Sequence, residues 1–222
     1  MDFDPAILRN GLIVFFLLAS SLCLRAFAQA FVATKLGDRT PHAEGRLTLN
    51  PLPHVDLFGT VVLPLIFIFY LQPALSRQSL TMFLGWAKPV PINPNSFRNP
   101  RRDAVLVQFS GMAMGLLLLL GSAVAGGLLY RADPQIVEIF GILISINSSL
   151  IVFDCLPIPP LPGGGLLRYL GYISEETYQN MARWGGLVLL ILINLKPFAM
   201  VFGILQGLVA LPFIMILEAI AL

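Results

Sequence analysis

The chain has 222 residues, of which 57% are hydrophobic and only 12% are charged, and its mean hydropathy is +0.82. Soluble domains carry about 25% charged residues, so this composition excludes an ordinary soluble fold, and its apolar content excludes a disordered chain. The net charge of +2 gives no support to a nucleic-acid partner. The composition therefore predicts an all-α polytopic membrane protein whose first partner is the lipid bilayer.

A membrane-spanning helix needs roughly 20 predominantly apolar residues, and four stretches of the chain meet this requirement. Towards the carboxyl end, a short apolar stretch and a long one are separated by Lys196 and Pro197. The short stretch suits a re-entrant segment as well as a span, so we expect a single transmembrane domain, residues 1–222, with five or six spans. The predicted spans cover residues 12–33, 55–71, 104–129, 136–152, 182–195 and 198–222.

Two pairs of glycines, each four residues apart, lie inside predicted spans: Gly111 with Gly115, and Gly203 with Gly207. Glycines at this spacing let two helix backbones approach closely. In a protein with several spans we expect both pairs to pack against other helices of the same chain, with dimerisation as the alternative.

Three segments outside the regular apolar stretches carry long motifs. Residues 45–59 read G-R-L-T-L-N-P-L-P-H-V-D-L-F-G, residues 85–94 read G-W-A-K-P-V-P-I-N-P, and residues 153–163 read F-D-C-L-P-I-P-P-L-P-G. Together they resemble the motifs of the site-2 protease family of intramembrane zinc metallopeptidases, in its short form, over about residues 24–165. The resemblance implies a bundle of five to six transmembrane helices with short extended or re-entrant segments, and zinc as the family's cofactor.

The resemblance also shows where the family's zinc site should lie. In the family, an H-E-x-x-H helix supplies two histidine ligands and a glutamate base, and the aspartate of a D-G motif supplies the third ligand. Residues 36–38, which resemble the family's L-G-D, align this helix so that Arg25, Ala26 and Gln29 replace His, Glu and His, while Pro162 replaces the aspartate. These residue types cannot form a zinc site, so we expect zinc and hydrolytic activity to be lost.

Arg25 lies inside a predicted span, where a charged side chain costs about 2.5–3.5 kcal/mol on insertion scales unless it is paired or hydrated. Asp154 stands where the family has asparagine, so the chain has a new carboxylate close to its new guanidinium. We predict that Arg25 and Asp154 form a structural ion pair, with an added hydrogen bond from Gln29, which replaces zinc as the link between two spans. The alternatives are that Arg25 extends to an interface or a hydrated cavity, or that it contacts a substrate.

The two histidines, His42 and His54, both lie in the first loop, and Glu44 and Asp56 follow them two residues later. All four are suitable zinc ligands, so one alternative is an active zinc metallopeptidase with a relocated metal site. A structural role in folding the loop explains His54 and Asp56 more simply, and His42 is expected to face water. A second alternative is an anion channel or transporter that uses a cavity around Arg25.

The proline-rich segment from Pro157 through Pro159 and Pro160 cannot be regular helix, and the glycines from Gly163 onward are expected to add flexibility. In working members of the resembled family, such segments pair with unwound substrate. Pro157, Pro159, Pro160 and Gly163 are therefore candidate client-binding positions, acting by strand addition. The equal alternative is that the segment serves structural packing alone. Residues 85–94 are expected to form a re-entrant or interfacial hairpin.

The sequence thus predicts a catalytically inactive site-2-protease-like protein, a pseudoprotease. Its expected role is to bind transmembrane clients or to serve as a subunit of a larger membrane complex. The expected location is the cell (inner) membrane of a prokaryote, as a multi-pass protein.

Overall fold

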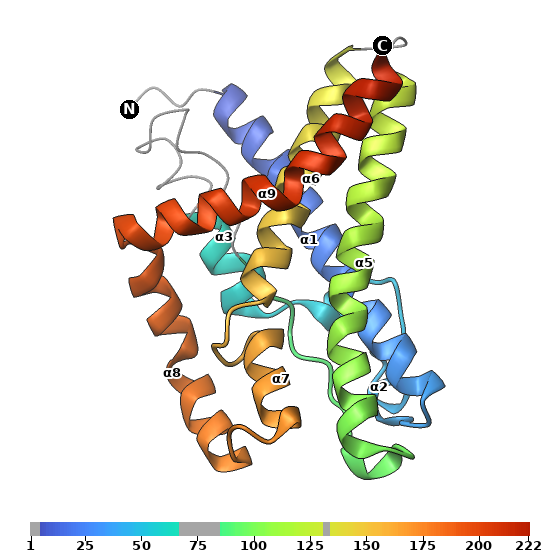
Figure 1. Ribbon diagram of the computed structural model, residues 1–222, viewed down its shortest axis with the longest axis vertical. Coiled ribbons are helices and arrows are strands. Elements are labelled where there is room, and N and C mark those ends of the chain that lie inside the picture. Colours follow the sequence, from blue (N-terminus) through green and yellow to red (C-terminus); the bar gives the residue numbers. More distant parts are fainter. Residues whose placement is uncertain (1–4, 67–84, 131–133) are drawn as a thin grey trace.

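The computed structural model describes residues 5–66, 85–130 and 134–222, and every regular element in these ranges is helical (Figure 1). This confirms the predicted fold class. The α-helices are α1 (Pro5–Lys35), α2 (Thr40–Ala43), α3 (Leu63–Ile66), α5 (Pro100–Leu129), α6 (Pro134–Asp154), α7 (Pro162–Leu170), α8 (Glu175–Ile193) and α9 (Lys196–Ala221). Short 3₁₀ turns lie at Leu52–His54 and Pro94–Ser96, and Leu57–Val62 is a π-helical segment.

Within the described part of the chain, four helices are long and apolar enough to cross a membrane. They lie where the sequence predicts spans at residues 12–33, 104–129, 136–152 and 198–222. The four helical segments are Leu8–Lys35 in α1, Pro100–Leu129 in α5, Ile136–Asp154 in α6 and Lys196–Ala221 in α9. The protein is therefore a multi-pass integral membrane protein.

The two other predicted spans have a different outcome. The stretch at residues 55–71 is described only to residue 66, as the apolar helical segment Leu57–Ile66, and residues 67–71 lie outside the described residues. The stretch at residues 182–195 falls mostly within α8, whose first turn carries Glu175 and Glu176. The apolar part of α8 thus covers only its second half, which is shorter than a membrane-spanning helix requires.

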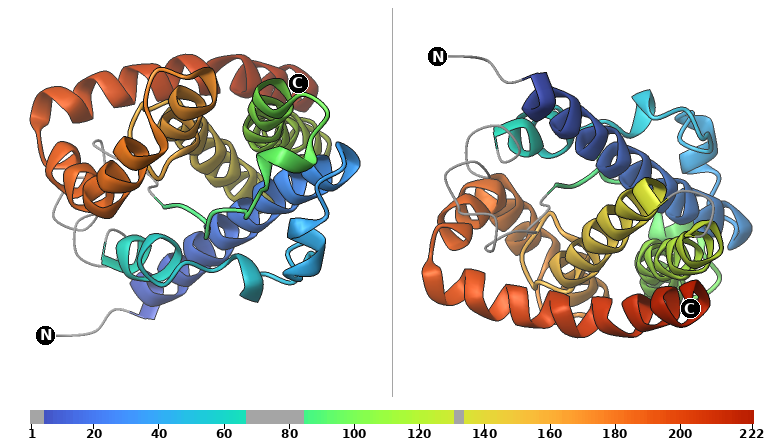
Figure 2. Two further views of the ribbon diagram at one scale, coloured as in Figure 1. Left: turned by 90° about the horizontal axis from the view of Figure 1, so that it is seen from below. Right: turned by 90° about the horizontal axis from the view of Figure 1, so that it is seen from above.

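The spanning helices form three layers. Figure 2 shows α1 along one side of the molecule, α9 along the opposite side, and α5 with α6 between them. Helix α5 packs against α1, α6 and α9. Aliphatic side chains fill the interfaces: Leu18, Leu22, Ile146 and Leu150 between α1 and α6, and Leu119, Ile144, Ala210 and Leu217 among α5, α6 and α9.

Buried polar side chains fix α6 against its two neighbours. Asn147 Nδ2 donates to Ser21 Oγ of α1 at 3.2 Å, and Gln206 Nε2 of α9 donates to Ser145 Oγ at 3.2 Å. Hydrogen bonds between helices in a membrane contribute about 0.6–2 kcal/mol each. They also specify which residues face each other, because an unmatched polar group in this apolar interior would be costly.

The two glycine pairs differ in their surroundings. A Cβ added at Gly111 would lie 2.7 Å from Gln29 Nε2, and one added at Gly115 would lie 3.2 Å from Arg25 Cζ, so this pair allows α5 to approach α1. Around Gly203 and Gly207, no described atom lies within 4 Å of an added Cβ. The prediction of packing within the chain is therefore confirmed for the first pair and wrong for the second.

The segment from residue 85 to residue 93 runs extended beside the first loop, so the predicted hairpin is wrong for these residues. The backbone N–H of Lys88 donates to the His54 carbonyl at 2.8 Å, and Arg46 Nη2 donates to the Lys88 carbonyl at 2.6 Å. Thr60 Oγ1 donates to the Trp86 carbonyl at 2.8 Å. The first loop thus fixes the position of this extended segment, and residues 85–93 carry one of the long motifs.

The proline-rich segment is irregular up to Leu161, as expected, but helix α7 begins at Pro162. Residues 163–165 therefore form the first turn of a helix instead of a flexible connection. Proline suits this first position because its missing N–H would have no helical partner there. A Cβ at Gly163 would lie 2.3 Å from the Leu156 carbonyl oxygen, so glycine here permits a close approach of two backbones.

Candidate functional site

A cavity of about 380 Å³ lies between α1, α5, α7 and α8. The extended segment at residues 85–93 and the proline-rich segment before α7 complete its walls. The four positions that the resemblance assigns to the metal site all line it. Arg25, Ala26 and Gln29 come from α1, and Pro162 comes from the first turn of α7. Asp154, at the end of α6, lines the cavity as well. Residues separated by up to 137 positions in the sequence are thus gathered around one space.

Arg25 and Asp154, the predicted pair, form an ion pair in the structure, between Nη2 of the arginine and Oδ2 of the aspartate. The two side chains are only 6% and 14% exposed. The ion pair links α1 to α6. Arg25 is thus directed into the protein interior and does not extend to an interface.

The ion pair leaves part of the guanidinium without a hydrogen bond. Arg25 Nη1 is buried and has no hydrogen-bond partner among the described residues; it would lie 3.4 Å from a Cβ added at Gly115. Gln29, predicted to hydrogen-bond to the ion pair, makes no such bond in the described part of the chain, and its amide lies against Gly111 instead. An unsatisfied buried donor costs about 1–3 kcal/mol. Among the described residues, Asp154 is therefore the side chain that compensates the buried guanidinium of Arg25.

The residues around this cavity do not fit zinc. Catalytic zinc takes three protein ligands from histidine, glutamate, aspartate or cysteine. Of the four positions that correspond to the family's metal site, Arg25 offers only protonated nitrogens, Ala26 and Pro162 offer no side-chain donor atom, and Gln29 offers only a neutral amide. Asp154 supplies one carboxylate, which is already paired with Arg25. The described side chains thus offer a metal ion one carboxylate, that of Asp154, and this carboxylate lies next to the cationic side chain of Arg25.

The first loop does not assemble the alternative metal site in the described residues. His54 is buried, and its Nε2 lies 2.9 Å from the Thr48 carbonyl oxygen, whereas His42 and Glu44 are exposed. Asp56 caps the following helical segment by accepting from two backbone N–H groups. No three His, Cys, Asp or Glu side chains in the described ranges lie close enough together to hold a metal ion.

Burial lowers the pKa of His54, because the uncharged imidazole is favoured away from water. His54 is thus held neutral, with Nε2–H donating to Thr48. This arrangement supports the structural interpretation of His54 and Asp56. His42 faces water, as predicted.

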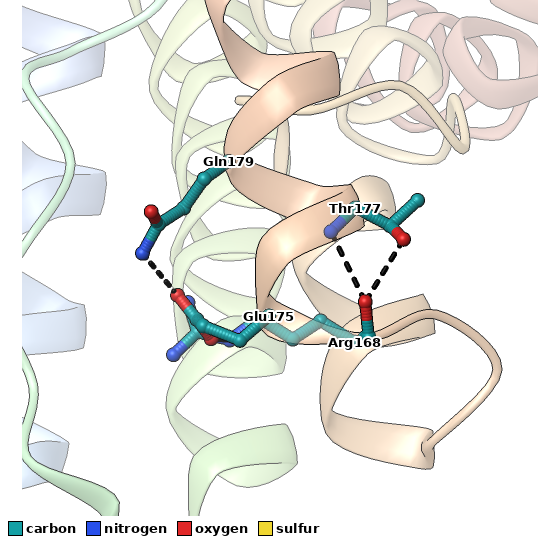
Figure 3. Close-up of polar contacts among 5 residues, drawn as sticks. Arg168, Glu175, Thr177 and Gln179 are labelled. Atoms are coloured by element: carbon teal, nitrogen blue, oxygen red, sulfur yellow. Dashed lines mark hydrogen bonds and ion pairs between the residues drawn. The ribbon is translucent and has the colours of Figure 1, made fainter.

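A second cluster of charged and aromatic side chains, which was not predicted from the sequence, lies where α7 and α8 meet. Arg168 lies over the rings of Tyr169 and Tyr178, at 4.8 and 5.1 Å from their centroids, and forms an ion pair with Glu175. Figure 3 shows the region of Arg168 and Glu175, with dashed lines for the hydrogen bond from Gln179 to Glu175 and for the bonds at Thr177. Recognising the turn between α7 and α8 would have brought Arg168 and Glu175 together, since Gly171 has the positive φ of a helix end.

The four candidate client-binding residues are in different surroundings. Pro160 lines the cavity. Pro159 and Gly163 are buried, the first against Gly185 of α8 and the second against the backbone of residue 156. Pro157 is exposed. Of these four residues, Pro160 is the one that lines the cavity.

Comparisons with known proteins support the resemblance. The chain is 31% identical to the protein named "Putative zinc metalloprotease YwhC" of Bacillus subtilis (strain 168), over 185 residues that cover 80% of this chain and 77% of that protein. It is 28% identical to "Putative zinc metalloprotease Rip2" of Mycolicibacterium smegmatis and 29% identical to the protein of the same name from Mycobacterium tuberculosis. These two matches cover 63% and 64% of the relatives' length. No family model and no solved structure matches the chain.

Proposed function

The chain belongs to the site-2 protease family of intramembrane zinc metallopeptidases, and we propose that it is a catalytically inactive member, a pseudoprotease. Its scaffold holds a membrane client or serves as a subunit of a membrane complex. The relatives are named zinc metalloproteases, so the proposal concerns what this chain has lost. The proposal includes a location in the cell membrane of a prokaryote, since the relatives come from bacteria.

One observation carries the proposal, namely the identity of the side chains at the metal positions. Arg25 stands where a histidine ligand is needed, and its guanidinium is engaged by Asp154. A protonated guanidinium has no lone pair for a metal and would repel a divalent cation. With Ala26 at the position of the general base, the carboxylate that would activate water is missing too. Fold similarity cannot replace these atoms.

A client-binding role is supported by the walls of the cavity. The backbone groups of Trp86 are hydrogen-bonded to the π-helical segment Leu57–Val62, and those of Lys88 are hydrogen-bonded to the first loop. Backbone groups alternate in direction along an extended chain, so those of Ala87 and Pro89 are directed away from the first loop. Both residues line the cavity. Among the described residues, the backbone groups of Ala87 and Pro89 have no hydrogen-bond partner, and their carbonyl oxygens suit an extended polypeptide that supplies N–H donors.

Cleavage of a single-span substrate tests the proposal. The protein is reconstituted in liposomes with a model transmembrane substrate. A matched variant restores the family's residues: Arg25→His, Ala26→Glu, Gln29→His and Pro162→Asp, with Asp154→Asn. We expect no cleavage by the wild type, with or without added zinc. The restored variant is expected to take up zinc, which shows that the scaffold tolerates the metal site.

Chelator-sensitive cleavage by the wild type would refute the pseudoprotease. Binding of the uncleaved substrate to the wild type, measured by co-purification in detergent, separates the two proposed roles. Retention of the substrate supports a client-holding protein. Absence of binding leaves the role of a subunit in a membrane complex.

A further inference from the structure

The charges that line the cavity are not balanced. Three of the lining residues are cationic, Arg25, Lys88 and Arg168, and one, Asp154, is anionic. Arg25 is neutralised by Asp154, and Arg168 by Glu175, which lines a separate pocket on the outer side of α7. Lys88 has no ion-pair partner among the described residues. One unpaired positive charge therefore remains at the cavity.

Lys88 is held in place by its backbone. Its N–H donates to the His54 carbonyl, and its own carbonyl accepts from Arg46 at 2.6 Å. The side chain is exposed while the backbone is fixed. An ammonium group on a fixed backbone loses less conformational freedom on pairing with an anion than a lysine on a mobile loop does.

Neutral hydrogen-bond donors line the same space. Gln29 and Gln108 place amides there, and Tyr169 and Tyr178 place phenol rings. Burial raises the pKa of both tyrosines, so their hydroxyl groups stay protonated at neutral pH. Arginine and lysine groups can only donate, amide and phenol groups can both donate and accept, and the one carboxylate is already engaged. The side chains that line the cavity therefore include no free carboxylate among the described residues.

We propose that this cavity binds an extended polypeptide segment through an acidic side chain, whose carboxylate pairs with Lys88. The inference rests on the proposed function and specifies the class of client. A peptide suits the site better than a phospholipid, because the amide side chains and the extended segment that line the cavity can hydrogen-bond to a peptide backbone but not to an acyl chain. An anionic lipid headgroup is the competing occupant that the experiment must distinguish.

Binding of three capped pentapeptides tests the proposal. They differ only in their central residue, which is glutamate, glutamine or lysine. The chain has two tryptophans, and a Trp184→Phe background leaves Trp86, which lines the cavity, as the fluorescent reporter in detergent. We expect the glutamate peptide to bind about fivefold more tightly than the glutamine peptide, as for a single partly exposed ion pair, and the lysine peptide to bind most weakly.

Two variants identify the charge responsible. Lys88→Gln should remove the preference for glutamate, so that the glutamate and glutamine peptides bind with equal affinity. The matched control Lys35→Gln changes an exposed lysine at the end of α1, and it should retain the preference. Equal binding of the three peptides to the wild type, or an unchanged preference in Lys88→Gln, would overturn the inference.

The same assay separates the competing occupant and the underlying proposal. If phosphatidylglycerol changes Trp86 fluorescence in a Lys88-dependent way and no peptide binds, the occupant is a lipid headgroup and the inference is overturned. Cleavage of a bound peptide would refute the pseudoprotease, whereas the preference for glutamate is measured from binding alone. The two failures therefore have different signatures.

Discussion

Removing Arg25 should destabilise the protein because Asp154 would be left without its partner. In the structure the two side chains form an ion pair that connects α1 to α6 at 6% and 14% exposure. The Arg25→Leu variant keeps an apolar side chain in the span but leaves a carboxylate with no cation beside it. The change in the free energy of unfolding therefore reports the uncompensated charge of Asp154 more than a loss of packing.

The size of the effect follows from the burial of the ion pair. Removing one partner of a buried ion pair costs about 3–5 kcal/mol. Asp154 lines a cavity and retains some exposure, so water offsets part of the penalty and the lower end applies, about 3 kcal/mol. That corresponds to a change of about 100-fold in the unfolding equilibrium. The double variant Arg25→Leu with Asp154→Asn removes both charges and should recover most of the loss.

Equilibrium unfolding in mixed detergent micelles, with increasing dodecyl sulfate, measures these differences. The four proteins of a double-mutant cycle give the coupling between the two side chains, which we expect to exceed about 2 kcal/mol. Arg101→Leu, at the exposed beginning of α5, is the matched control and should stay within about 0.5 kcal/mol of the wild type. The account of the ion pair would be refuted if Arg25→Leu were as stable as the wild type. It would also be refuted if the double variant, Arg25→Leu with Asp154→Asn, were no more stable than Arg25→Leu.

Two further predictions concern other parts of the fold. Gly185→Ala should destabilise the protein by about 1–3 kcal/mol, because its Cβ would lie 1.7 Å from the Pro159 carbonyl oxygen, whereas Gly141→Ala has open space and should be neutral or stabilising. Melting temperatures of the two variants in detergent test this, and equal effects would contradict the close contact. Burial lowers the pKa of His54 from its usual 6.5, so the unfolded chain binds a proton more readily below that pH. Stability should be full above about pH 6.5 and fall on acidification, and His54→Gln, but not His42→Gln, should weaken this dependence.

Much of the candidate site could be predicted, because its residues follow from a local sequence motif or from the electrostatic cost of a charge in a span. The alignment on residues 36–38 assigned Arg25, Ala26 and Gln29, and the cost of a charge in a span required a partner such as Asp154. All of these residues line one cavity in the structure. The spans were predictable for a similar reason, since length and apolarity determine them.

The parts that the sequence could not reveal depend on which surfaces meet in three dimensions. The consecutive glycines after Pro162 suggest flexibility from the sequence, but in the structure they form the first turn of α7, with Gly163 against the backbone of residue 156 and Gly164 against Pro159. The ion pair between Arg168 and Glu175 requires the chain to reverse between α7 and α8. Likewise, nothing in the spacing of Gly203 and Gly207 tells which face of α9 meets the rest of the bundle.

The central claim, that the metal chemistry has been lost, is tested most directly by the zinc content per polypeptide. Elemental mass spectrometry would be applied to the detergent-purified wild type and to a His54→Ala variant prepared in the same way. The account predicts near-zero zinc in both proteins. Stoichiometric zinc in the wild type would contradict it, and loss of that zinc in the His54→Ala variant would place the metal in the first loop.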